Sequence, residues 1–193
     1  MSQLAAAVLI AVITLIGSAA VAALISARWQ RNQYEADTLH AAFKSVMEAH
    51  ARLNGDAIIV VSRLDIATKT GHIWEFQRQE MTLAMEAAQQ HAVELASRVN
   101  VCAGVMEDPE ASTALEDLVE AARELTRALG LIQGWYSSPS VKDGIVIRVR
   151  EGTTHSAAVE TITAAMDNLI EQNRRFIRVA RVRWRDLLDI LPR

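Results

Sequence analysis

The sequence predicts an all-α protein in which one N-terminal transmembrane helix continues into an antiparallel four-helix bundle. Three observations support this prediction. Glycine and proline are scarce, at 8 and 3 of 193 residues, whereas sheet proteins need many turns. Residues 4–27 carry no charge. The rest of the chain holds four stretches in which apolar residues recur every three or four positions.

The uncharged segment 4–27 is long enough to cross a bilayer. At about 1.5 Å per residue it spans roughly 36 Å, against about 30 Å of hydrocarbon. A cleavable signal peptide is the alternative, and the Ala-Val-Ala sequence at 20–22 suits its cleavage. Only Ser2 and Gln3 follow the first methionine, however, so the basic n-region of such a peptide is missing. The chain therefore divides into a short tail (1–3), a retained transmembrane helix (4–27) and a helical bundle domain (28–193).

The flanking charges predict the orientation of this anchor. Arg28 and Arg31 follow the segment, and no Lys or Arg precedes it. The positive-inside tendency places the C-terminal domain in the cytoplasm, at the inner membrane. The layout resembles that of many small bacterial and phage proteins with one N-terminal anchor and a helical cytoplasmic domain. This likeness concerns layout alone and names no family.

Beyond the anchor, the first helix is expected to continue to about Gly71. An apolar stripe runs along it at helical spacing: Phe43, Val46, Met47, His50, Leu53, Ala57, Val60, Leu64 and Ala67. The β-branched run AIIVV after Asn54 and Gly55 allows an alternative, an α+β fold with a small hairpin at 57–77 that turns at Thr70-Gly71. We prefer the helix because it keeps the stripe in register across Gly55.

Three further helices are expected, over about 72–102, 110–133 and 154–191. Asp108 suits the cap of the second of these, with Pro109 at its first position, and Thr153 or Ser156 suits the cap of the last. The helix at 110–133 has the most regular seam, which indicates packing against another helix as in a coiled coil: Leu115, Leu118, Ala122, Leu125, Leu129 and Ile132. Between the last two helices, apolar and polar residues alternate in the segment IVIRVRE, as they do in a strand. The sequence shows no evident second strand with which it would pair.

Arginines are concentrated near the end of the last helix, and in an up-and-down bundle that end returns to the level of the anchor. We predict contact with the membrane surface or a partner for Arg28, Arg31, Arg174, Arg175, Arg178, Arg181, Arg183 and Arg185. Anionic headgroups are one counterpart. The other is an acidic face on the preceding helix, formed by Glu116, Glu120 and Glu124. Arg175 and Arg183 have no evident acidic partner. Nucleic acid is disfavoured, because the net charge is −3 and stacking aromatics are few.

The sequence offers no catalytic, cofactor-binding or metal-binding constellation. A di-iron bundle needs repeated Glu-x-x-His motifs, and the nearest match, Asp37 to His40, occurs once. His50 and His91 lie on apolar stripes, where a hydrogen-bonded core histidine is the expected role. Cys102 has no neighbour that would activate its thiol, so it reads as a core residue.

These features predict a non-enzymatic, single-pass membrane protein without a cofactor or small-molecule substrate. Its expected role is structural, adaptor-like or in assembly: it holds a protein partner, or its own oligomer, at the inner membrane. The alternative is an envelope-facing helical sensor or a phage lysis protein. A short N-terminus, one span and a helical tail are similar to the layout of inner-membrane spanins, and in that case the bundle lies outside the cytoplasm.

Overall fold

Four long helices make up nearly all of the part of the chain that the structure describes. The computed structural model describes the backbone of residues 3–106, 108–136, 141–142, 145–146 and 154–189, and the side chains of 26–106 (except 29 and 32), 108–136 and 154–182. The helices are α1 (Gln3–Thr70), α2 (Glu75–Met106), α3 (Pro109–Tyr136) and α4 (His155–Asp189). Three two-residue strands join them: β1 (Ile73–Trp74), β2 (Val141–Lys142) and β3 (Ile145–Val146).

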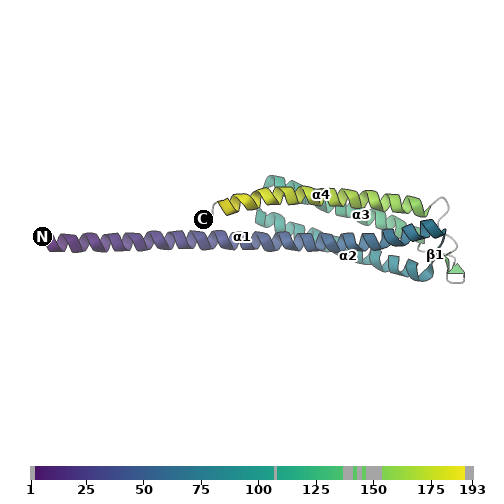
Figure 1. Ribbon diagram of the computed structural model, residues 1–193, viewed down its shortest axis with the longest axis horizontal. Helices are drawn as coiled ribbons and strands as arrows, with labels where there is room; N and C mark the ends of the chain where they lie inside the picture. The colour runs from purple at the N-terminus through teal and green to yellow at the C-terminus, as the bar shows by residue number, and fades with distance from the viewer. Residues whose placement is uncertain (1–2, 107, 137–140, 143–144, 147–153, 190–193) are drawn as a thin grey trace.

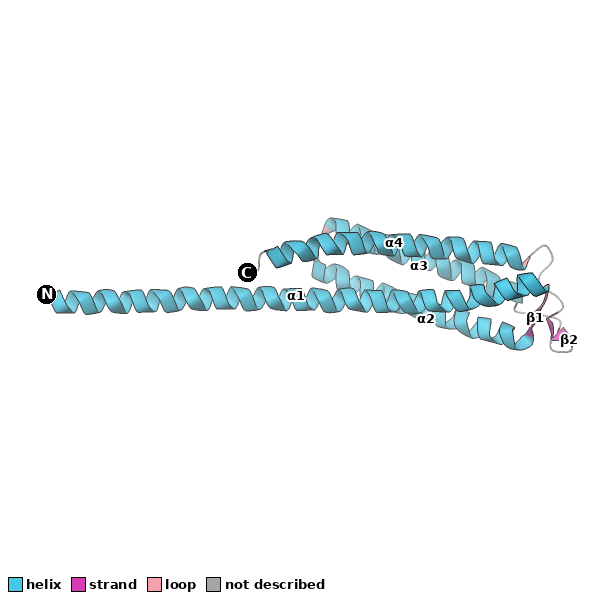
Figure 2. Cartoon of the chain, viewed as in Figure 1, coloured by secondary structure: helices cyan, strands magenta, loops and turns pink. Residues whose placement is uncertain are grey.

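The helices run alternately up and down and close into a bundle (Figure 1). Each helix packs on the next in sequence, and α4 packs on α1. The N-terminal part of α1 projects beyond the other three helices, and α4 ends on that same side, whereas the strands lie at the opposite end (Figure 2). The predicted antiparallel four-helix bundle is therefore confirmed.

The segment predicted to span a membrane is helical throughout, as the N-terminal part of α1. The side chains of residues 3–25 lie outside those that the structure describes. Within the residues that the structure describes, no helix combines the length and the apolar character needed to cross a bilayer. The transmembrane assignment of 4–27 therefore stays a prediction.

The apolar stripe of α1 forms one wall of the core. Leu53, Val60 and Leu64 are fully buried, on the side of α1 that faces the other helices. The helix continues through Gly55 without a break to Thr70, so the alternative of a hairpin at 57–77 is wrong. The β-branched run 57–61 stays helical because its stripe residues continue the buried face of α1, and tertiary packing outweighs strand propensity.

Gly71 ends α1, as predicted. Its backbone φ is 74°, in the left-handed region, and its N–H donates to the carbonyl oxygen of Ala67 at 2.8 Å. This is the usual way in which a glycine closes a helix and satisfies one of its last carbonyl groups.

A small sheet lies beyond this turn, and it corrects two expectations. Ile73 and Trp74 pair with Val146 and Ile145, so the IVIRVRE segment does have a strand partner. Trp74 belongs to this sheet and is 41% exposed, whereas the sequence predicts it within the helix at 72–102. The next helix starts at Glu75 rather than at about 72. Its start is capped by the buried Gln77, whose Oε1 accepts a hydrogen bond from the Trp74 N–H at 3.0 Å.

Side-chain hydrogen bonds cap the N-terminal ends of α3 and α4. Asp108 Oδ1 accepts hydrogen bonds from the N–H groups of Glu110 and Ala111, both at 2.9 Å, so its predicted capping role is confirmed. At α4 the cap is Thr154, whose Oγ1 accepts from the Ala157 N–H at 3.0 Å, rather than Thr153 or Ser156. Both α2 and α3 extend past the predicted ends, because Gly104 and Gly134 are accommodated within helix. Residue 191, the predicted end of the last helix, lies outside the described residues.

We expect alanine to have opposite effects at two glycines of α1. Gly71→Ala should lower the free energy of unfolding by about 1 kcal/mol, because an L-residue is strained at positive φ. Gly55→Ala should raise it by about 0.5–1 kcal/mol, because Gly55 lies inside a helix and an added Cβ meets nothing within 4 Å. Denaturant unfolding of the full chain, kept monomeric in detergent and followed by circular dichroism, measures both. Equal effects at the two sites would contradict this account.

Candidate functional site at the foot of the bundle

The predicted arginines gather at one end of the bundle. We call this end the foot: there α2 ends at Met106, α3 begins at Pro109 and α4 ends at Asp189. The rings of Phe43 and Phe176 pack 5.6 Å apart and set the register between α1 and α4. Both helices rise equally per residue, so Asp189 is level with about residue 30 of α1. The end of α4 therefore returns to the level of Arg28 and Arg31, as the up-and-down order predicts.

Several of these arginines already have acidic partners. Arg31 pairs with Glu35 at 2.8 Å, within α1. Arg174 and Arg178 both pair with Glu171 of their own helix, at 3.8 and 3.1 Å. Among the described side chains, Arg28 and Arg181 are exposed and make no ion pair. The side chains of Arg183 and Arg185 lie outside the described residues.

Arg175, for which the sequence suggests no partner, has one on α3. Its Nη1 donates to Oδ2 of Asp117 at 2.5 Å, and both side chains are partly exposed. Asp117 precedes Leu118 of the apolar seam. In the sequence, the place of Asp117 beside a seam residue could have indicated this ion pair, because a side chain at the edge of the seam lies next to a neighbouring helix.

Among the described side chains, Glu116, Glu120 and Glu124 make no ion pair with the arginines of α4. Glu120 is bound by Arg123 and Arg127 of its own helix, whose hydrogen bonds hold the pKa of its carboxyl below the usual value. Glu124 accepts a hydrogen bond from Asn168 at 2.6 Å. The antiparallel register explains this outcome: it places Asn168 opposite Glu124, while Arg178 and Arg181 lie farther toward the foot.

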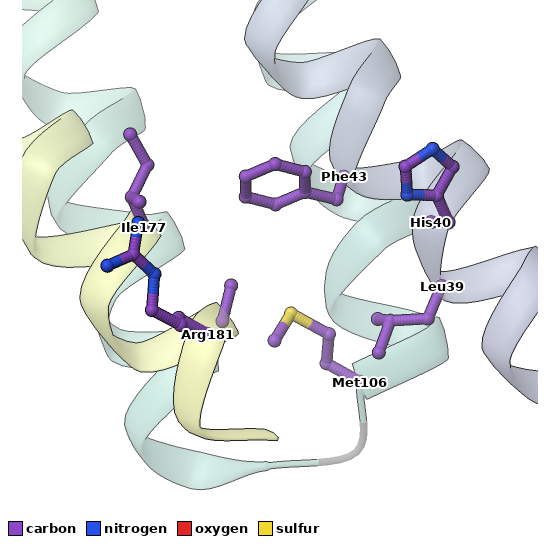
Figure 3. A pocket seen from close by; sticks show the side chains of 7 residues that line it. Leu39, His40, Phe43, Met106, Ile177 and Arg181 are labelled. Atoms are coloured by element: carbon purple, nitrogen blue, oxygen red, sulfur yellow. The ribbon is translucent and has the colours of Figure 1, made fainter. Parts of the chain in front are cut away.

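An apolar pocket of about 260 Å³ opens between α1, the end of α2 and α4 (Figure 3). In this view Phe43 and Ile177 face each other across it, and the Met106 side chain reaches in from α2. The full lining comprises Leu39, His40, Phe43, Met106, Ile177, Ala180 and Arg181. The volume is just under the roughly 300 Å³ at which pockets for small ligands begin. With two polar side chains in its lining, it suits a small apolar group.

A polar pair lies deeper in the bundle, between α1 and α4. Nδ1 of His50 and Nδ2 of Asn173 are 3.5 Å apart, a long hydrogen bond, and both residues are more than nine-tenths buried. Burial lowers the pKa of His50, because the charged imidazolium is poorly solvated there. The expectation of a hydrogen-bonded core histidine is thus confirmed. His91 is also hydrogen-bonded, with its Nδ1 2.6 Å from Oδ2 of Asp56 on α1, but it is half-buried rather than a core residue.

A second aromatic-polar pair, which the sequence did not reveal, joins α3 to α4 at the far end. Oη of Tyr136 lies 2.6 Å from Nδ1 of His155, and their rings stack. Burial raises the pKa of the Tyr136 phenol and lowers that of His155. The two residues are separated by a loop, so no helical spacing links them in the sequence.

The chemistry of the described residues is that of a packed bundle. Over the ranges that the structure describes, no three His, Cys, Asp or Glu side chains come together in a way that would hold a metal ion. Cys102 is buried, and burial raises the pKa of its thiol to about 11, which keeps it protonated and unreactive at neutral pH.

The comparisons with known proteins return no match. No family model fits the sequence, and no curated protein and no solved structure matches the chain.

We expect the protein to lose stability as the pH falls from 7.5 to 5.5. The pKa values of His50 and His155 are lowered by burial in the folded state, so the unfolded chain takes up these protons first. Stability is therefore complete above the unfolded pKa of about 6.5 and declines below it, by at most about 1.4 kcal/mol per pH unit for each histidine. His50→Gln and His155→Gln should each flatten the unfolding profile. An unchanged slope in both variants would contradict the prediction.

Filling the pocket should stabilise the foot. Ala180 is a pocket-lining residue of α4, and Ala180→Leu should raise the free energy of unfolding by about 0.5–2 kcal/mol. Ala158, also on α4, is fully buried and is not among the pocket residues. Ala158→Leu is the matched control and should lower stability by about 1–3 kcal/mol through overpacking. A loss of stability in both variants would show that the pocket is closed in solution.

Proposed function

We propose that the protein is a single-pass membrane protein whose helical bundle has a structural, adaptor or assembly role at the inner membrane. The anchor is the uncharged segment 4–27. The continuous helix of α1 supports it: a helix over this segment is roughly 36 Å long, which suffices for the hydrocarbon core. No polar backbone group of such a helix is left unpaired inside the lipid.

The observation that carries the proposal is the position of the foot. The end of α4 is level with about residue 30 of α1, only about 5 Å beyond the end of the uncharged segment. The C-terminal end of α4 then lies close to the bilayer surface. Arg28 and Arg31 lie at the depth of the headgroups, a layer about 5–8 Å thick on each side.

This geometry divides the eight arginines into groups. Arg174, Arg175 and Arg178 are level with residues 41–45 of α1, more than about 20 Å from residue 27, and each has an acidic partner within the bundle. Arg183 and Arg185 are level with positions about 10–14 Å from residue 27. We assign headgroup contact to Arg28, Arg31, Arg183 and Arg185, and a role within the bundle to the first three. Arg181 lines the pocket.

Exposed apolar side chains support an adaptor or assembly role. Ile58, Phe76, Leu83 and Val93 are all more than half exposed, on α1 and α2. Large apolar side chains on the outer faces of helices are typical of surfaces that bind other proteins. The bilayer and a protein partner or oligomer are therefore the proposed partners.

Membrane fractionation tests the anchor. The full chain should stay with the membranes after alkaline carbonate extraction. Ile13→Arg with Ile16→Arg should release it, because each arginine near the centre of a span costs about 2.5–3.5 kcal/mol. Gln90→Arg with Thr163→Arg, two exposed bundle positions, is the matched control and should remain in the pellet. A wild-type chain in the soluble fraction would overturn the proposal.

A C-terminal reporter tests the side of the membrane. A fluorescent protein that folds only in the cytoplasm should fluoresce, and an alkaline phosphatase fusion should be inactive. The reverse result would place the bundle outside the cytoplasm and favour the envelope-facing sensor or lysis protein.

A further inference from the structure

The solvent side of α1 is uncharged over a stretch where a surface helix is normally polar. Between Glu48 and Lys69, every residue in a sector of about 100° centred away from the core is small or apolar. We call this sector the α1 outer face: Ala51, Gly55, Ile58, Ile59, Ser62 and Ile66. Ile58, Ile59 and Ile66 are 51%, 43% and 37% exposed.

The fold of a single chain gives no reason for this composition. The core contacts of α1 come from the opposite side, through residues such as Leu53 and Val60. At Gly55 an added Cβ would meet nothing within 4 Å, so the packing of this chain does not require glycine there. Glycine inside a helix is unfavourable relative to alanine.

The α1 outer face continues onto α2. The ion pair between Arg63 and Glu80, at 2.8 Å, places this part of α2 beside α1. Phe76 and Leu83, which are 58% and 66% exposed, lie on the outward side of α2, at the same heights as the end of the α1 outer face.

The charges at the borders of this surface are compensated within the chain. Glu48 pairs with Lys44 at 3.8 Å, and Lys69 pairs with Asp65 at 2.6 Å. The surface is therefore apolar at its centre and electrically balanced at its ends. It suits an apolar counterpart better than a charged one.

We propose that the α1 outer face binds a second copy of this chain, in a parallel, two-fold symmetric dimer. The proposal rests on the proposed membrane anchor, because two copies in one membrane stand parallel and at equal height. A two-fold axis along the membrane normal then brings each residue of the face next to its own counterpart. Such an arrangement disfavours any face with unpaired charge, and this face has none at its centre.

The shape of the face fits a helix–helix contact. Successive members from Ala51 to Ile66 are spaced mainly by three and four residues, the spacing of a seam between two helices. Ala51, Gly55 and Ser62 allow close approach of the two backbones, and the isoleucines fill the space on either side. The contact extends along about 22 Å of α1.

Disulfide trapping in isolated membranes tests the dimer and its orientation. In a Cys102→Ser background, Ala51→Cys, Ile58→Cys and Ile66→Cys should each form a disulfide-linked dimer on mild oxidation. Leu131→Cys, on α3, is 50% exposed and is the matched control, which should remain monomeric. The proposal is overturned if no dimer forms, or if Leu131→Cys crosslinks equally. It is also overturned if Ile58→Cys alone crosslinks, since a lone central crosslink indicates antiparallel helices.

A charged substitution provides a second measurement, in which one cysteine reporter is kept and the α1 outer face itself is changed. With Ile66→Cys as reporter, Ile59→Asp should reduce the dimer yield roughly tenfold, because it places two carboxylates together at the interface. Leu131→Asp should leave the yield unchanged, and equal yields in both variants would overturn the proposal. Carbonate extraction of the same samples separates the two hypotheses: monomer in the pellet overturns the dimer alone, whereas soluble protein overturns the anchor.

Discussion

The packing of α1 against α4 is the contact on which the rest of this structure depends. The rings of Phe43 and Phe176 pack in a tilted arrangement near the foot, and His50 meets Asn173 deeper in the bundle. Because each residue of a helix rises by the same distance, one contact between α1 and α4 sets the height of every arginine on α4 relative to α1. It also leaves the pocket between Ile177 and Leu39, beside the end of α2. The same register underlies the proposed position of the foot on a bilayer.

Burial and charge contribute unequally to this arrangement. The core is a continuous column of apolar side chains, and the buried histidine and asparagine are exceptions within it. Ion pairs such as Arg52–Glu94 and Arg175–Asp117 lie at the edges of the helix contacts, where solvent is present. Exposed pairs of this kind contribute only about 0.2–1 kcal/mol each. They favour particular helix neighbours, while the apolar column supplies most of the stability.

Sequence patterns were reliable where one physical cause dominated. The seam residues of α3, from Leu115 to Ile132, are buried. A helix with one apolar stripe removes it from water by packing that side against its neighbours. Asp108 caps α3 and Gly71 ends α1, because each role depends on local backbone geometry. Local propensity was outweighed by packing at two places. The AIIVV run, for which a strand was the alternative, continues α1, and α3 runs through Gly134 beyond its predicted end at 133.

By itself, the sequence determined the number of long helices, their order, their buried stripes and most of their ends, because periodicity and capping act over a few residues. Only the tertiary structure decided which side chains meet between helices: Arg175 with Asp117, Asn168 with Glu124, and Tyr136 with His155. It also decided that β1 pairs with β3. A shift of one helical turn between two helices keeps every apolar stripe intact and replaces every such partner. That shift is invisible in a single sequence and is settled by the packing of the core.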